Sequence, residues 1–213
     1  MRIANRRKPN SDERRRDLCD AAIGLLGAHG ARAVSHRKVD QAAGVPDGTT
    51  SFYFRTRSAL FQAVAERVTE LDLDDLTAVS QTEVHESPSL PSKLAQIVFS
   101  SVDEPGLTRT KARYELALMA GRDPVMTQTL QQSTARFMQL GRDAVRTLQQ
   151  SDPAPSEELL EHQTIAAMMF INGVMFGIAR GDHPIRNPEQ LDRYLTGVVR
   201  GIVLPPVTPP AHP

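Results

Sequence analysis

The sequence predicts an all-α protein, and three observations support this fold class. The apolar residues are mainly Leu, Ala, Val, Ile and Met, whereas aromatic residues make up 5% and Trp is absent, a composition that favours helices. Apolar residues recur three or four positions apart, and clusters of Gly and Pro separate the segments that carry this pattern. No segment shows the alternation of a strand. A chain of 213 residues can hold a small domain followed by a larger one.

The first helix is predicted from about residue 11 to Gly30, with Asn10 or Ser11 as its N-cap. Its apolar residues share one face and are Leu18, Ala21, Ala22, Leu25 and Leu26. The three arginines at 14–16 precede this face near the solvent side.

A second, shorter helix is predicted to begin after Ser35, its N-cap, and to stop at Gly44. Its expected buried residues are Val39, Ala42 and Ala43. A third helix follows, and Asp47 or Pro46 is expected to cap it. Two short helices joined by a Gly turn, the first packed through its apolar face, form a helix-turn-helix.

The third helix carries the side chains that a helix in the major groove needs. Small polar residues at its start could approach base edges, and donors or flat side chains further along could meet sugars and phosphates. The residues with these properties are Gly48, Thr49, Ser51, Phe52, Tyr53 and Arg57. The alternative is an ordinary helical hairpin whose aromatic residues belong to the core. Phe54 is expected in the core under either interpretation.

Basic residues are concentrated in the same region. Residues 1–60 hold 12 Lys or Arg against 6 Asp or Glu, and the remainder holds 13 against 19. This asymmetry indicates a module that meets a polyanion, joined to a body that does not. An incidental basic surface is the alternative.

A long helix is predicted next, because Leu60, Val64, Val68 and Leu71 form one stripe that Leu76 could extend. A loop rich in Pro and Ser ends it near residues 85–92. Five further helices are predicted at about 93–102, 108–120, 125–150, 157–180 and 188–202. The Pro-rich end at 205–213 is expected to be disordered.

The last two helices carry residues that suit a two-fold, four-helix dimer interface. Gly173 and Gly177 leave one side of their helix bare enough for close helix packing. The last helix has an apolar stripe of Leu191, Tyr194, Leu195 and Val198, continued by Ile202. The alternative is packing within one chain alone.

An adaptable apolar cavity in the body is a further hypothesis, since flexible Met side chains can line one. The candidate lining residues are Phe99, Met119, Phe137, Met138, Met168, Met169 and Phe176. Ordinary core packing is the alternative.

The sequence gives little evidence for a catalytic site or a metal site. The six His residues lack metal-ligand spacing, no G-x-S-x-G occurs, and the single Cys19 cannot form an internal disulfide or a Cys-pair metal site. We therefore expect no enzyme, cofactor or metal, although a catalytic site built from residues distant in sequence stays an alternative.

The N-terminus has no apolar h-region, and the apolar run 164–179 is shorter than a membrane span and is interpreted as a buried helix. A soluble, cytoplasmic protein without a membrane association is expected.

The stretches "AAIGLLGAHGARAVSHRKVDQAAGV" and "GTTSFYFRTRSALFQAV" resemble the DNA-binding head and fourth helix of the tetracycline-repressor (TetR) family of bacterial transcription regulators. The resemblance runs from Arg14 to about Val68; beyond that only the layout is similar. It implies DNA contacts from Ser35, Arg37, Lys38, Asp47, Gly48, Thr49, Ser51, Phe52, Tyr53 and Arg57. In this chain Thr50 replaces the family's usual buried Leu, which predicts looser seating of the helix or a hydroxyl bonded back into it.

The resemblance also implies a homodimer that binds double-stranded operator DNA and releases it when a small, apolar effector binds the body. The expected domains are a DNA-binding head at 1–56, an effector-binding and dimerisation body at 57–203 and the tail at 204–213. A dimeric DNA-binding regulator without an effector remains the main alternative.

Overall fold

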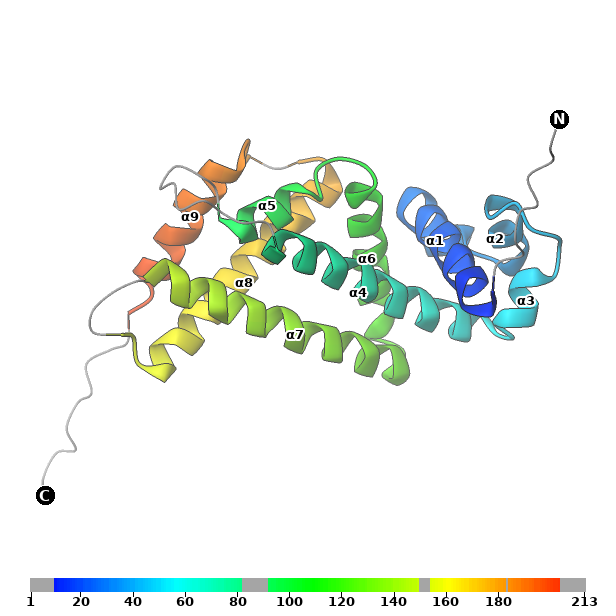
Figure 1. Ribbon diagram of the computed structural model, residues 1–213, viewed down its shortest axis with the longest axis horizontal. Helices are drawn as coiled ribbons and strands as arrows, with labels where there is room; N and C mark the ends of the chain where they lie inside the picture. Colours follow the sequence, from blue (N-terminus) through cyan, green and yellow to red (C-terminus); the bar gives the residue numbers. More distant parts are fainter. Residues whose placement is uncertain (1–9, 82–91, 150–153, 183, 204–213) are drawn as a thin grey trace, which may run out of the picture. The chain divides into compact units, whose positions relative to one another are not determined.

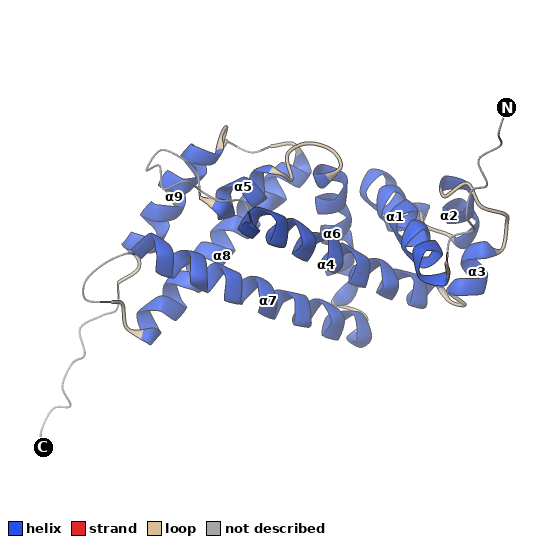
Figure 2. Cartoon of the chain, in the orientation of Figure 1, coloured by secondary structure: helices blue, strands red, loops and turns tan. Residues whose placement is uncertain are grey.

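The computed structural model describes residues 10–81, 92–149, 154–182 and 184–203, and every regular element in these ranges is a helix (Figures 1 and 2). The α-helices are α1 (Ser11–His29), α2 (His36–Ala42), α3 (Thr49–Tyr53), α4 (Arg57–Gln81), α5 (Lys93–Phe99), α6 (Gly106–Ala120), α7 (Pro124–Gln149), α8 (Glu157–Arg180) and α9 (Pro188–Gly201), with a short 3-10 helix, η1 (Ala31–Ala33). The all-α prediction is confirmed. The predicted tail at 204–213 lies outside the described residues.

The first two helices begin where the sequence predicted. Asn10 caps α1 in a capping box: its Oδ1 accepts from the backbone N–H of Glu13 at 2.8 Å, and the Glu13 carboxylate accepts from the backbone N–H of Asn10 at 2.9 Å. Ser35 caps α2 and accepts from the backbone N–H of Lys38. Local side chains therefore determine both starting points.

The predicted cap of α3 is wrong. Neither Asp47 nor Pro46 but Gly48 holds the N-cap position, with a φ of +90° that favours glycine, and no side chain of the cap residue bonds to the helix. Ala42 is also exposed rather than buried, whereas Val39 is buried in the core and Ala43 packs partly against it.

The chain packs into two compact units. The first unit comprises residues 10–81 and 100–133, so α4, α6 and the start of α7 pack with α1–α3, and α6 lies along α1. Its core is Leu18, Cys19, Ala22, Ile23, Leu26, Val34, Val39, Phe54, Leu60, Phe61, Val64, Ala65, Val68, Ala112, Leu116, Ala120 and Met126. The burial of Phe54 was predicted. The packing boundary thus lies well beyond residue 56, and the functional boundary predicted there stays a prediction.

Close contact between α1 and α6 depends on Gly27. A Cβ at this position would lie 2.1 Å from the backbone oxygen of Thr108 and 2.8 Å from its Cγ2. Only a residue without a side chain allows the two helices to approach so closely.

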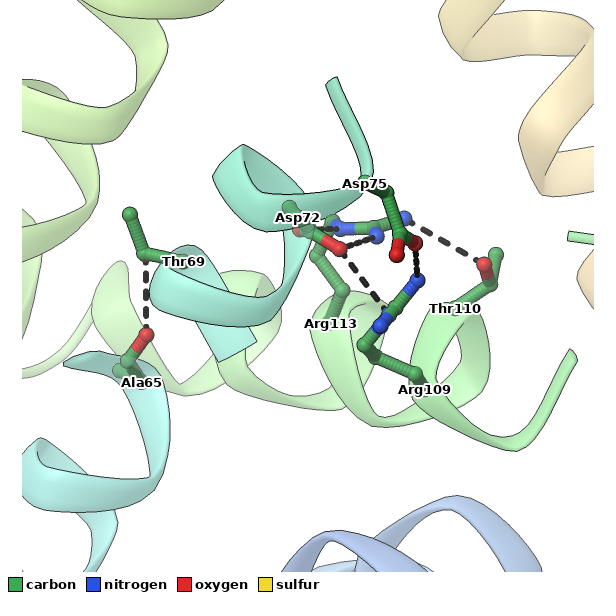
Figure 3. A network of polar contacts seen from close by, with 7 residues as sticks. All are labelled: Ala65, Thr69, Asp72, Asp75, Arg109, Thr110 and Arg113. Carbon is green, nitrogen blue, oxygen red and sulfur yellow. Dashed lines mark hydrogen bonds and ion pairs between the residues drawn. The ribbon is translucent and has the colours of Figure 1, made fainter. Parts of the chain in front are cut away.

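An ion-pair network joins α4 to α6 within the first unit (Figure 3). Asp72 of α4 is 6% exposed and accepts from Arg113 of α6 at 2.6 and 2.9 Å. Arg109 of α6 pairs with Asp75 and also lies with its Nε 3.1 Å from Asp72 Oδ1. That Nε is buried and makes no hydrogen bond of good geometry, so its attraction to Asp72 is an ion pair. Asp72 therefore holds two arginines of α6 against α4.

The second unit comprises residues 92–99, 134–149, 154–182 and 184–203, and α9 packs against both α8 and α5. Gln163 of α8 is buried and donates to the backbone oxygen of Val199 at 3.0 Å. Asp192 of α9 accepts from the backbone N–H and the hydroxyl of Ser92, the residue before α5. Polar contacts, one buried and one half-buried, thus link α9 to α8 and to the start of α5.

The run 164–179 is only half buried. One face of α8 is inside the unit, and its buried residues are Leu160, Gln163, Thr164, Ala167, Ile171, Val174 and Ile178. Its other face exposes apolar side chains, including Ile165 and Met169. Among the described residues α8 alone is long and apolar enough to cross a membrane, a property that core helices of water-soluble proteins share. The interpretation as a buried helix is therefore confirmed for one face of α8 and wrong for the other.

Candidate nucleic-acid interface

The start of α3 is held by a carboxylate from α2. Asp40 is 1% exposed, and its Oδ2 accepts from the backbone N–H of Gly48 at 2.8 Å. Its Oδ1 accepts from the backbone N–H of Thr50 at 2.7 Å and from the Thr50 hydroxyl at 2.5 Å. A negative group at a helix N-terminus satisfies free N–H groups and complements the helix dipole. Asp40 thus performs the capping that Gly48 cannot.

The end of α3 is held by two basic side chains. Arg15 of α1 donates to the backbone oxygen of Tyr53 at 3.2 Å and lies 4.6 Å from the ring centroid of Phe54. His36 Nε2 lies 2.7 Å from the backbone oxygen of Phe54, and since a carbonyl only accepts, this nitrogen carries the proton. A five-residue helix is too short to be stable alone. Groups from α1 and α2 therefore fix it at both ends.

The contacts of these three residues with α3 were missed by sequence reasoning. Asp40 and His36 were not assigned a role. Arg15 is exposed, as expected, but its bond to the end of α3 was not predicted. The Thr50 hydroxyl bonds to Asp40 and not back into its own helix, and the side chain is fully buried rather than loosely seated. Two features of the sequence could have indicated this contact: the acidic Asp40 lies beside the buried Val39, and Thr50 stands where the resemblance calls for Leu.

The outer surface around α3 contains most of the predicted DNA contacts. Those that are exposed are Ser35, Arg37, Lys38, Asp47, Gly48, Ser51, Phe52 and Arg57; Thr49 and Tyr53 are half-buried. We call the exposed and half-buried set together the α2–α3 surface. The charged side chains of Arg37 and Lys38 form no hydrogen bond or ion pair with the described part of the chain. The surface therefore combines basic side chains that pair with no other described residue with small polar groups.

Phe52 and Tyr53 face in different directions. Phe52 is 79% exposed, whereas Tyr53 packs partly against the core of the first unit, and the two rings meet edge to face with centroids 5.2 Å apart. Thr49 donates its hydroxyl proton to the backbone oxygen of Pro46 at 2.6 Å, which leaves its methyl group and its oxygen lone pairs for other contacts.

Arg57 begins α4, and part of its guanidinium is already engaged. Its Nη2 donates to the backbone oxygen of Ala31 at 2.6 Å, and its charge lies 5.1 Å from the ring centroid of Phe61. Arg57 thus ties the start of α4 to η1. Its remaining N–H groups are the ones left for a phosphate.

The predicted dimer residues divide between two faces of α8 and α9. Leu191 and Leu195 form the inner stripe of α9 and are fully buried within the second unit. With the helices packed in this way, they cannot contact a second chain. Tyr194, at 52% exposure, and Gly173 lie outside, and a Cβ on Gly173 would meet no atom within 4 Å. Gly177 and Val198 are half-buried.

The exposed side chains of α8 extend this outer surface. Ile165 and Met169 lie four residues apart, Gly173 follows four later, and Phe176 completes the stripe, beneath the guanidinium of Arg180. We call the residues Ile165, Met169, Gly173, Phe176 and Tyr194 the α8–α9 surface. Its four α8 residues form one apolar stripe that is exposed in an isolated chain.

The candidate cavity residues do not gather in one place. Met119 belongs to the first unit, where it packs against the core. Phe99, Phe137, Met138 and Met168 are half-buried in the second unit, whereas Met169 and Phe176 are exposed. Helices α7 and α8 cross closely here, since a Cβ on Gly141 would lie 2.4 Å from the sulfur of Met168.

Cys19 is buried in the core of the first unit. Burial raises the pKa of its thiol to about 12, and the nearby charge of Asp20 adds to this effect. The thiol is therefore protonated at neutral pH and is a poor nucleophile there.

Two family models match the chain. Residues 18–64 match the bacterial regulatory proteins of the tetR family, which covers the α2–α3 surface. Residues 91–201 match the tetracyclin repressor-like C-terminal domain, which covers more than half of the chain.

Solved structures share the fold over nearly the whole chain. A transcriptional regulator from Rhodococcus sp. Rha1 has a TM-score of 0.66 at 16% identity and covers 90% of this chain and 99% of its own. The multidrug binding protein EbrR, in complex with imidazole, has a TM-score of 0.60 at 24% identity, with coverage of 94% and 99%. A Saccharomonospora viridis protein in complex with choline has a TM-score of 0.68 at 17% identity, with coverage of 89% and 96%.

Among curated proteins, the nucleoid occlusion factor SlmA of Glaesserella parasuis is 27% identical over 103 residues. That match takes in 48% of this chain and 51% of the relative. The chain thus spans about half the length of the curated relatives it matches.

Proposed function

Because the chain belongs to the tetracycline-repressor family of DNA-binding transcriptional regulators, we propose that it is a homodimeric repressor that leaves its operator when a small organic ligand binds. The observation that carries this proposal is the α2–α3 surface, where a short helix is fixed at both ends and presents small polar and basic groups outward. A helix held in this way is suited to enter the major groove. The protein would act in the cytoplasm, where its DNA is found.

The proposed contacts follow from exposure and chemistry. Arg37 and Lys38 of α2 would neutralise phosphates, together with the uncommitted part of Arg57. Ser51 and Phe52 of α3 would face base edges and sugars, and the methyl group of Thr49 could meet a thymine methyl. Phosphate contacts would position the head, and α3 would read sequence.

The salt dependence of DNA binding tests the phosphate contacts. Arg37→Ala should weaken binding of preferred and random duplexes about equally, and it should flatten the slope of log affinity against log salt by about one unit for each half-site. Arg57→Ala should affect DNA binding in the same way. In addition, it should lower the melting temperature of the protein, because it removes the bond to Ala31. Arg136→Ala, an exposed arginine of α7, is the control. A slope unchanged by Arg37→Ala would remove this residue from the interface.

A dimer is supported by the α8–α9 surface. Met169 is 73% exposed and Phe176 is 48% exposed in the isolated chain, and a second copy related by a two-fold axis would cover both. Gly173 leaves room for close helix approach. Two heads in such a dimer would match half-sites about one turn of DNA apart, roughly 34 to 36 Å, or somewhat more.

Release of DNA would use the link between α4 and α6. Arg109 and Arg113 of α6 both hold Asp72 of α4, so any displacement of α6 that followed ligand binding would also displace α4. Helix α4 begins four residues after the end of α3. Tilting of α4 would therefore move the heads apart and break their match to the two half-sites.

The effector is proposed to be a small, largely apolar organic molecule. EbrR, with a similar fold, has been solved with ethidium and with imidazole, and another protein of this fold with choline. The half-buried Phe99, Phe137, Met138 and Met168 are the proposed lining in the second unit.

Thermal melting with a panel of small organic compounds tests this part of the proposal. At least one compound, with choline and ethidium among the first to be tried, should raise the melting temperature, because a ligand that binds only the folded state stabilises it. The same compound should weaken binding to the operator. If a wide panel produced neither a thermal shift nor release of DNA, the regulator without an effector would be favoured.

A further inference from the structure

We propose that Asp40 is a positioning residue for DNA recognition: its buried carboxylate sets the orientation of α3 on which discrimination between DNA sequences depends. The inference rests on the proposed reading of DNA by α3. Asp40 itself touches no DNA, because it is 1% exposed beneath the helix.

The geometry separates this role from general packing. A buried Leu at position 50, which the family resemblance would call for, could fill the site without fixing a direction. Asp40 instead uses both of its oxygens on donors from the turn and from α3, with distances of 2.5 to 2.8 Å to Gly48 and Thr50. Such charge-assisted hydrogen bonds are short and directional. A rotation or shift of α3 would break at least one of them.

The other side chains of α1 and α2 that bond to α3 act at its opposite end. Arg15 and His36 bond to the backbone oxygens of Tyr53 and Phe54, at the last residue of the helix and just beyond it. Without Asp40, the only side chains of α1 and α2 that bond to α3 would hold its C-terminal end, and its N-terminal end would be held less firmly. Thr49 and Ser51, which are proposed to meet the bases, are the first and third residues of α3.

Electrostatics alone predicts the opposite effect of removing this charge. A carboxylate close to DNA repels phosphates, so its loss should strengthen binding to every duplex. A fall in operator affinity after the negative charge is removed would therefore report orientation. This difference in sign makes the positioning role testable.

The experiment compares Asp40→Asn with the wild type on two duplexes: the sequence that the wild-type protein selects from a random pool, and a random sequence of equal length. The Asn side chain has nearly the same shape, but its Nδ2 would face a backbone N–H, where two donors meet. We expect the ratio of the two affinities to fall about ten-fold, which is the scale of one base contact, while affinity for random DNA stays equal or rises. Glu66→Gln, which removes one negative charge from the surface of α4, should leave the ratio unchanged.

Thr50→Val provides a second measurement should Asp40→Asn fold poorly. It removes the hydroxyl that donates to Asp40 while keeping the side-chain shape, and it should lower the ratio in the same direction. The double variant should lose less than the sum of the two single losses, because both act on one hydrogen-bonded unit.

Each variant is compared below its own melting temperature, so that only folded protein is measured. An unchanged ratio in the folded variants, or an equal loss on both duplexes, would overturn the positioning role. A wild-type protein that selects no sequence would instead contradict the proposed reading of DNA by α3.

Discussion

Replacing Met169 by aspartate is expected to convert the proposed dimer into monomers and to reduce operator affinity by at least about 100-fold. Met169 would be buried between two copies, and the two-fold axis would place two new charges in the same interface. Burying an unpaired charge costs several kcal/mol, and the two-fold axis applies this cost twice in one interface. A monomer would contact only one half-site, so its affinity would approach that of a single head.

Sedimentation equilibrium and titration of labelled operator measure the two effects. Leu118→Asp is a matched control, because Leu118 is 76% exposed on α6 and Met169 is 73% exposed on α8. The control should remain a dimer with wild-type affinity. A dimer that survives Met169→Asp would show that a different surface joins the two copies.

Asp72→Asn is expected to lower the free energy of unfolding by about 3 kcal/mol, since breaking a buried ion pair on one side leaves uncompensated charge inside the protein. Arg113 would lose both of its charge-assisted bonds to Asp72, and Arg109 would keep only Asp75 as a partner. Urea unfolding followed by circular dichroism measures the loss. The expected loss of unfolding free energy is large, because Asp72 is 6% exposed and solvent screens its charge little.

Asp74→Asn, on the exposed side of the same helix, is the matched control and should change the unfolding free energy by less than about 0.5 kcal/mol. Equal losses for the two variants would mean that the network seen in Figure 3 is not a specific link between α4 and α6. The proposed mechanism, in which movement of α6 is transmitted to α4 and to the DNA-binding head, would then lack its physical link.

Local side chains explain why some elements could be predicted from the sequence. Asn10 and Ser35 cap their own helices, so the starts of α1 and α2 follow from nearby residues. The length of α8 was predicted correctly, because Ser156 caps it and Gly181 ends it with a positive φ. Where both ends of a helix are determined by adjacent residues, the sequence is enough.

Tertiary contacts explain what could not be predicted. The cap of α3 comes from Asp40, eight residues before Gly48, and no helix-start rule looks so far back. The two faces of α9 were confused for a related reason. Leu191 and Tyr194 share one apolar pattern, and only the position of α8 decides which is inside. Apolar stripes identify a buried surface but not the partner that buries it.

The central claim is that the chain reads double-stranded DNA as a symmetric dimer through α3. Selection of duplexes from a random pool by the wild-type protein, followed by sequencing, tests it most directly. We expect the selected duplexes to share an inverted repeat, with half-site centres about 10 base pairs apart or somewhat more. A pool that stays random after repeated rounds, or converges on a single unrepeated site, would contradict the claim.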